Sequence, residues 1–173
     1  VFQDATSIPF TINGGEYKQG DQSLPAVTAS IAKGQDGKVY IALATGGLEP
    51  AEGIIRARIG RDPRNRKRMA VVERGREAET SFRVLERLSN FTLVEAFPKT
   101  GRTHQIRVHF SSLGHPLAGD TLYGGKDRRL DRQFLHAHVL GFRLPGTGEY
   151  MEFTSPLAPE LGAFLVQMHG DEV

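Results

Sequence analysis

The residues best suited to chemistry are concentrated at positions 100–125, which read TGRTHQIRVHFSSLGHPLAGDTLYGG. Three apolar side chains there recur at the spacing of one helix face: Ile106, Phe110 and Leu113. Gly114 is placed for a C-cap and Pro116 lies just beyond it, so the pattern predicts a short helix. At about 100° per residue, a different face carries three polar residues: His104, Arg107 and Ser111. We expect that face to look outward, toward something polar.

Three histidines in this stretch raise the question of a metal site: His104, His109 and His115. The first two are separated by about 140° around a helix, so they do not share a face as the histidines of an H-E-x-x-H motif do. His109 can equally be a buried, hydrogen-bonded core histidine, and His115 a turn residue. Asp120 is best interpreted as a turn-capping aspartate. We therefore expect no metal site.

The segments TGRTHQIRVH and LGHPLAGDTLYG resemble the C-terminal signature of the RluA/RluD-type RNA pseudouridine synthases. Other segments resemble this family in the same order along the chain. KVYIAL at 38–43 is similar to its K-x-Y-x-A-L strand, and ETSFRVL at 79–85 is similar to its x-T-x-F-x-V-L strand. Residues 135–137 and 145–156 resemble its closing strands. The resemblance runs from about residue 38 to about residue 161 and fades before residue 38.

The resemblance implies an isomerase that converts uridine to pseudouridine in structured RNA, ribosomal or transfer RNA, with no cofactor and no metal. The family's catalytic tyrosine falls on Tyr40, and its arginine, the second of G-R-x-H-Q-x-R, falls on Arg107. Its aspartate lies in a motif like H-R-L-D-x-x-T-S-G, for which the upstream candidate is Asp4 in VFQDATSI. Asp4 lacks the preceding His-Arg-Leu and the following glycine, and one residue instead of two separates it from Thr-Ser.

The chemistry of such a reaction needs few groups. A carboxylate can attack the sugar or remove a proton from it while the N-glycosidic bond breaks and the uracil rejoins through carbon. An aromatic ring such as Tyr40 can stack on the everted base. Arg107 would keep the carboxylate ionised through a bidentate pair. Two alternatives stay open: an inactive RNA-binding relative or fragment that retains the cleft, and a hydrolase, for which no two facing carboxylates can be identified.

Residues 56–68 hold six arginines and one lysine against a single acid. Such a cluster is typical of an RNA-phosphate contact, although a solvated charged loop has the same composition. The expected RNA-binding residues are Arg56, Arg58, Arg61, Arg64, Arg66, Lys67 and Arg68, together with Arg102 and His104. Three acids that follow, Glu73, Glu77 and Glu79, confine the positive patch.

The remaining patterns predict the fold. Residues 1–37 carry turn signals every few positions and are expected to be an irregular N-terminal segment. From residue 38, period-2 alternation and turn residues predict strands at 38–44, 54–59, 69–72, 80–86, 91–97, 134–144 and 150–154, and a helix follows at 158–168. We expect an α+β fold with one domain, a mostly antiparallel mixed sheet and a few flanking helices. Residues 38–173 would form the catalytic domain.

Composition excludes several classes of protein. The 173-residue chain has no cysteine, so it has neither disulfides nor a thiolate site. Its formal net charge is only +2, so an RNA-binding surface must come from local clustering. No apolar run approaches the roughly 20 residues of a membrane span, and the N-terminus does not have the pattern of a signal peptide. We expect a soluble, cytoplasmic monomer with RNA as its partner.

Overall fold

The computed structural model describes residues 17–19, 22–24 and 36–170. The first two ranges are short strands, β1 (Tyr17–Gln19) and β2 (Gln22–Leu24), which pair in antiparallel fashion. Most of the predicted irregular segment 1–37 lies outside the described residues, and so does Asp4. No helix of the described residues is long and apolar enough to cross a membrane.

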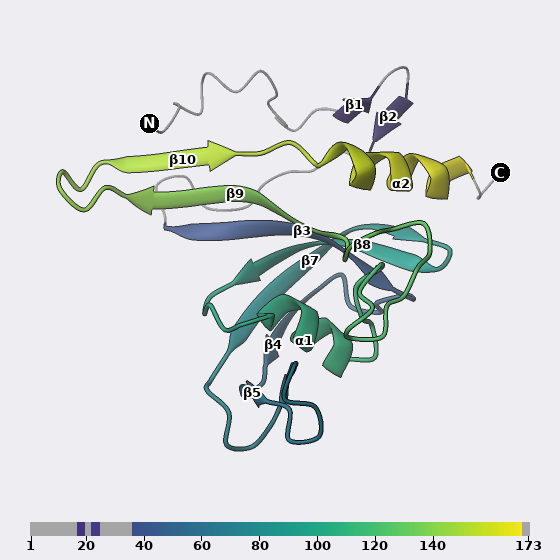
Figure 1. Ribbon diagram of the computed structural model, residues 1–173. Coiled ribbons are helices and arrows are strands. Elements are labelled where there is room, and N and C mark those ends of the chain that lie inside the picture. The colour runs from purple at the N-terminus through teal and green to yellow at the C-terminus, as the bar shows by residue number, and fades with distance from the viewer. Residues whose placement is uncertain (1–16, 20–21, 25–35, 171–173) are drawn as a thin grey trace.

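Six strands form one sheet in the order β10-β9-β3-β8-β7-β4, and every neighbouring pair is antiparallel (Figure 1). The strands are β3 (Gly37–Thr45), β4 (Glu52–Arg56), β7 (Glu79–Leu88), β8 (Phe91–Pro98), β9 (Leu135–Arg143) and β10 (Tyr150–Thr154). Short turns join β7 to β8 and β9 to β10, which makes antiparallel pairing the natural outcome. The predicted α+β fold on a mostly antiparallel sheet is confirmed.

The two central strands, β3 and β8, send alternate side chains to opposite faces of the sheet, as period-2 alternation requires. On one face, Leu43 and Leu93 pack with Leu161 and Phe164 of the C-terminal helix α2 (Pro159–Gly170). On the opposite face, small residues of the same strands pack with helix α1 (Gln105–Ser112): Ala42, Ala44, Val94 and Ala96 lie near Ile106 and Phe110. The sheet is therefore covered on both sides, and α1 lies on the face that carries Tyr40 (Figure 1).

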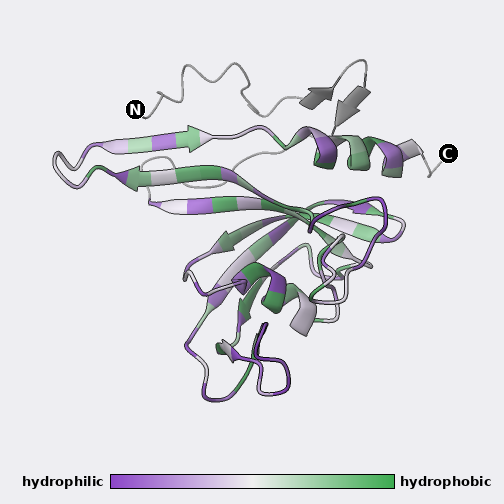
Figure 2. Ribbon diagram, in the orientation of Figure 1, coloured by the Kyte–Doolittle hydropathy of each residue, from purple (hydrophilic) through white to green (hydrophobic). Residues whose placement is uncertain are grey.

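The predicted strand 54–59 is wrong in one respect, because the chain leaves the main sheet within it. Arg56 is the last residue of β4 to pair with β7, and Ile59 begins β5 (Ile59–Arg61), which pairs with β6 (Met69–Val71) in a separate hairpin. Ile59 is buried with Val108 of α1 and Tyr123, so packing against the helix overrides the continuing strand pattern. The loop that joins β5 to β6 is strongly hydrophilic (Figure 2).

Candidate active site

Helix α1 is tied to the sheet by one buried amide, that of Gln105. Its Nε2 donates to the Glu79 carbonyl oxygen and to Thr80 Oγ1, both at 2.9 Å. Its Oε1 accepts from Thr100 Oγ1 at 2.7 Å and from the Arg102 backbone N–H at 3.0 Å. Since all four contacts are made inside the protein, the start of α1 is held in one position relative to β7.

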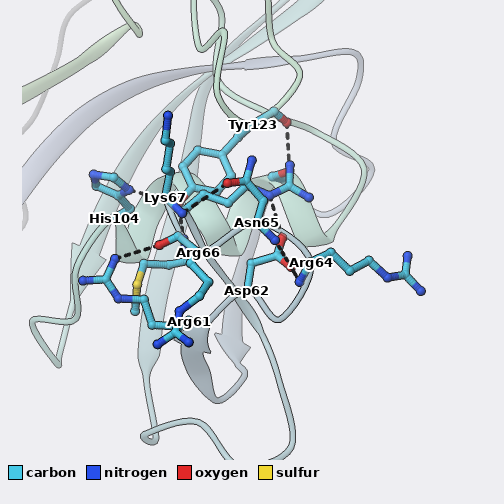
Figure 3. A network of polar contacts seen from close by, with 11 residues as sticks. Arg61, Asp62, Arg64, Asn65, Arg66, Lys67, His104 and Tyr123 are labelled. Carbon is cyan, nitrogen blue, oxygen red and sulfur yellow. Dashed lines mark hydrogen bonds and ion pairs between the residues drawn. The ribbon is translucent and has the colours of Figure 1, made fainter.

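His104 precedes the helix in the left-handed region, with φ 55° and ψ 23°. A non-glycine residue is strained in this region and stays there only when its surroundings hold it. The holding contact is made by the side chain, because His104 Nδ1 lies 2.9 Å from the hydroxyl oxygen of Tyr123. The same oxygen accepts the Met69 backbone N–H at 3.0 Å. Tyr123 thus joins the first residue of β6 to the start of α1, and Figure 3 shows Tyr123 beside His104.

Arg107 forms a two-point ion pair with Asp120. Arg107 Nε lies 2.7 Å from Asp120 Oδ2, and Arg107 Nη2 lies 2.9 Å from Asp120 Oδ1. The guanidinium carbon also lies 4.9 Å from the centre of the Tyr123 ring. The hydrogen bond to Asp120 raises the pKa of Arg107, and burial opposes it. Such a planar, bidentate pair fixes the direction of the guanidinium as well as its charge.

The expectation that the polar face of α1 looks outward is confirmed only in part: His104 and Arg107 line a pocket, but a loop covers much of this face. Residues 119–125 cover this face, where Arg107 binds Asp120 and Ser111 donates to the Tyr123 carbonyl oxygen. The covering loop depends on glycine: Gly119 has φ +75°, and a Cβ at this position would lie 2.2 Å from the Arg132 carbonyl oxygen. Only glycine tolerates that conformation and that approach together.

Asp120 caps its own loop, as the sequence predicted, because Oδ1 accepts the backbone N–H groups of Leu122 and Tyr123, both at 3.2 Å. With Arg107 on the same carboxylate and almost no exposure, Asp120 holds the loop and the arginine in place. Its oxygens face protein donors, so it is a positioning group and not one that can reach a substrate.

A pocket of about 740 Å³ opens beside these residues. Tyr40, His104 and Arg107 all line it, although they come from a strand, a cap and a helix. Three further cations stand around the same pocket: Lys38, Lys99 and Arg102. Among the described residues, Asp36 is the one carboxylate that lines it. The pocket is therefore an electropositive cavity with one aromatic ring, a form that suits a nucleotide.

The predicted RNA-binding residues on β4, β5 and the loop divide into two groups. Three arginines pair with acids: Arg56 with Glu79 at 2.7 Å, Arg58 with Glu77 at 3.3 Å and Arg68 with Asp62 at 2.6 Å. The hydrogen bond from Arg68 lowers the pKa of Asp62. Arg61 donates to the Arg66 carbonyl oxygen at 3.1 Å. Within this set, the exposed cations that form no ion pair with a described residue are Arg61, Arg64, Arg66 and Lys67.

The other two histidines of residues 100–125, His109 and His115, make hydrogen bonds inside the protein. His109 is fully buried, with Nδ1 2.9 Å from Thr80 Oγ1 and Nε2 3.3 Å from the Ala57 carbonyl oxygen. Burial lowers its pKa, and the Ala57 contact opposes this shift. His115 Nδ1 lies 2.9 Å from the Thr45 carbonyl oxygen. The interpretation of His109 as a buried, hydrogen-bonded core residue is confirmed.

Two residues that organise the site were not singled out from the sequence, Gln105 and Tyr123. Gln105 stands between His104 and Ile106, and a polar residue at the start of a predicted helix gives no sign that it is buried. Tyr123 follows Asp120 by three positions, the reach of an aspartate that caps its own turn, and this spacing was the available signal.

Comparison with known proteins defines the class. The profile of the RNA pseudouridylate synthase family matches residues 21–112. That match takes in β3 to β8 and all of α1, so Tyr40, His104 and Arg107 all fall within it. The chain belongs to this family, and the RluA/RluD-type resemblance of its motifs is confirmed.

Individual relatives agree with this assignment. A protein of Chloroflexus aurantiacus named as an uncharacterized RNA pseudouridine synthase is 45% identical over 150 residues, which are 86% of this chain and 47% of that protein. The ribosomal large subunit pseudouridine synthase D of Nitrosomonas europaea is 46% identical over 135 residues, 73% of this chain and 39% of that protein. The chain thus spans less than half the length of these relatives.

A solved structure extends the similarity to three dimensions. Human RNA pseudouridylate synthase domain containing 1 is 35% identical and superposes with a TM-score of 0.65, over 73% of this chain and 58% of that one. The six-stranded sheet with helices on both faces is therefore the pseudouridine synthase fold.

Proposed function

We propose that this chain catalyses the isomerisation of uridine to pseudouridine in RNA. One observation carries the proposal: the strand tyrosine Tyr40 and the helix arginine Arg107, far apart in sequence, line a single electropositive pocket. The ring offers a stacking surface for an everted uracil, whose removal from the stack costs a few kcal/mol. Lys38, Lys99 and Arg102 offer phosphate contacts that offset this cost.

The catalytic carboxylate that we propose is Asp4, which would attack the ribose or take a proton from it. Asp120 does not suit this role, because its two oxygens already accept four protein hydrogen bonds. Among the described residues, Arg107 Nη1 has no hydrogen-bond partner, so it remains available to a carboxylate or a substrate oxygen in the pocket. Neither a cofactor nor a metal is part of the proposed reaction.

The test is pseudouridine formation on unmodified ribosomal and transfer RNA transcripts, mapped by chemical derivatisation and primer extension. Asp4→Asn should abolish the reaction and leave RNA affinity unchanged. Asp36→Asn is the matched control, because it removes the one carboxylate that lines the pocket among the described residues and should leave activity intact. Activity that survives Asp4→Asn but is lost with Asp36→Asn would move the catalytic role to Asp36.

The substrate class that we propose is ribosomal or transfer RNA, bound by a monomer in the cytoplasm. The exposed cations of the β5–β6 loop favour a structured RNA as the substrate. They lie outside the pocket and would contact phosphates beyond the target nucleotide. The competing proposal is an RNA-binding relative that has kept the pocket and lost the reaction. It predicts tight binding of the same transcripts with no pseudouridine in the wild-type chain, and the atypical surroundings of Asp4 favour it.

A further inference from the structure

The hydrogen-bonding pattern around Tyr123 fixes where the imidazole of His104 carries its proton. The hydroxyl oxygen of Tyr123 receives the Met69 backbone N–H, so the hydroxyl proton is free to be donated. Among the described residues, the acceptor within reach is His104 Nδ1, at 2.9 Å. A neutral imidazole that accepts on Nδ1 must carry its proton on Nε2. The result is one defined tautomer with a donor on the far side of the ring.

The surroundings of His104 also favour the neutral ring. Burial lowers its pKa, the positive charge of Arg107 lowers it further, and Asp120 opposes the shift. Burial raises the pKa of Tyr123, which keeps the phenolic proton in place as the donor. His104 therefore differs from the cationic groups of the pocket, because it offers a directed hydrogen bond without a charge.

The direction of that donor is set by the contact between Nδ1 and Tyr123, on a backbone held in the left-handed region. With φ 55° at His104, one ring nitrogen faces Tyr123 and the other points away from the β5–β6 loop (Figure 3). His104 lines the same pocket as Tyr40 and Arg107. A neutral N–H that is held at two points, by the backbone and by Nδ1, can discriminate between chemical groups, whereas a mobile lysine cannot.

We propose that His104 is a specificity-determining residue whose Nε2–H donates to the O4 carbonyl oxygen of a uracil base in the pocket. This inference rests on the proposed function, because it takes the pocket to be the site of the target nucleotide. Uracil presents an acceptor oxygen at the position where cytosine presents an amino donor. A fixed donor therefore forms a hydrogen bond with uracil O4. With cytosine in the same place, the donor would face the amino group, which is also a donor. Phosphate is the less suitable ligand for this neutral group, since Lys38, Lys99 and Arg102 supply the charge around the pocket.

The experiment compares the affinity of the full chain for pentauridylate and pentacytidylate. We expect the wild type to prefer pentauridylate by about tenfold, the ratio that one matched hydrogen bond supplies. His104→Asn is the sharpest variant, because asparagine tolerates the left-handed backbone and its Oδ1 can still accept from Tyr123, but it has no donor at the Nε2 position. Its preference should fall to about one, because uridine binding loses a hydrogen bond and cytidine binding is relieved of the facing donor.

Matched tyrosine variants test the role of the anchor. Tyr123→Phe removes the hydroxyl that fixes the tautomer and should reduce the uridine preference. Tyr150→Phe removes a hydroxyl on β10 that donates to Glu152 Oε2, away from the pocket, and should leave the preference intact. A wild-type ratio near one, or a ratio that survives His104→Asn, overturns the inference.

A second measurement needs no variant. Long-range ¹H–¹⁵N correlation spectra of the wild-type histidines distinguish the two neutral tautomers and the charged ring directly. His104 should show a protonated Nε2 and a bare Nδ1 at neutral pH, and a protonated Nδ1 overturns the assignment. These results are separable from the proposed function: uridine selectivity without pseudouridine formation refutes only the reaction, whereas pseudouridine formation without selectivity at His104 refutes only this inference.

Discussion

Two regions of this molecule use the same chemistry, an arginine paired with a carboxylate, under opposite conditions. In the site, Arg107 and Asp120 have side chains that are 13% and 0% exposed. At the sheet edge, Arg58 and Glu77 are 57% and 82% exposed. The buried pair has two short hydrogen bonds and a ring beneath the guanidinium, whereas the exposed pair has one bond of 3.3 Å.

The two pairs differ in what they contribute: the buried pair fixes a geometry, whereas the exposed pair leaves its arginine able to change partners. A buried pair is expensive to desolvate, and breaking it leaves an uncompensated charge, so it holds one geometry. Exposed pairs are screened by water and salt and contribute little to stability. Cations in that setting are instead available to a polyanion, because an arginine can exchange a weak partner for a phosphate. The buried pair therefore fixes the position of Arg107, and under the proposed function the exposed cations would attract RNA.

The largest effect is expected when the buried pair is broken. Arg107→Ala should lower pseudouridine formation by at least about 100-fold and destabilise the fold by roughly 3–5 kcal/mol, because Asp120 is left as an unpaired buried charge. Single-turnover rates and chemical denaturation measure the two losses.

A second substitution separates the structural loss from the functional one. Arg107→Ala combined with Asp120→Asn removes the stranded charge, so it should recover part of the stability and none of the activity. Recovery of both would mean that Arg107 acts only by holding the loop. A hydrolase that does not use the arginine would lose little activity in either variant.

The loop should show the reverse behaviour. Replacing Arg64, Arg66 and Lys67 together by alanine should weaken RNA binding and reduce the slope of log affinity against log salt by about 2, since each lost contact to single-stranded phosphate is worth about 0.7. The rate at saturating RNA should be unchanged. The charge-conserving control exchanges the two arginines for lysine and Lys67 for arginine, and its slope should match the wild type. An unchanged slope in the alanine variant would remove the loop from the RNA interface.

A smaller effect should appear in the pH dependence of stability, through buried His138. Burial lowers the pKa of His138, and the Ser155 carbonyl oxygen, 2.7 Å from Nδ1, opposes the shift. The unfolded chain, with an ordinary pKa near 6.5, then binds the proton more readily than the folded chain. This contribution to stability is fully present above about pH 6.5 and is lost as the pH falls toward the lowered folded value.

Denaturation midpoints measured between pH 7.5 and 5 give the slope of stability against pH. His138→Asn keeps a side-chain N–H for Ser155 and removes the titrating group, so the dependence should become shallower. If this substitution left the slope unaltered, the pH dependence of stability would come from other titrating groups.

The smallest effect is expected at the exposed pair. Arg58→Ala should change the free energy of unfolding by less than about 1 kcal/mol, because both partners are solvated. Its effect on RNA affinity should vanish at high salt. A stability loss as large as that of Arg107→Ala would contradict the distinction between the two regions.

The sequence predicted the sheet well, because residues 38–44 and 91–97 alternate with the period of a strand that has two different faces. The prediction from sequence failed between residues 54 and 59. The strand-like alternation continues there although the chain leaves the main sheet, and only the tertiary packing of Ile59 distinguishes β4 from β5.

Within the site, motif similarity placed Tyr40 and Arg107, and both line the pocket. The partner of Arg107 could not be predicted in the same way. Asp120 reaches it through a loop whose course depends on a left-handed Gly119, and the spacing of residues does not encode such a turn. Asp4 stays a prediction, since it lies outside the described residues.

One contact has a consequence for how this scaffold could diversify. The β5–β6 hairpin is fastened to Tyr123 by the main-chain N–H of Met69, a donor that almost any residue supplies at this position. The exposed side chains of Arg64, Arg66 and Lys67 are therefore exchangeable without loosening the attachment, whereas buried Asp62 and its partner Arg68 hold the loop itself. A foreign hairpin with a backbone N–H at this position would keep the attachment to Tyr123 and, under the proposed function, would change which RNA the chain contacts.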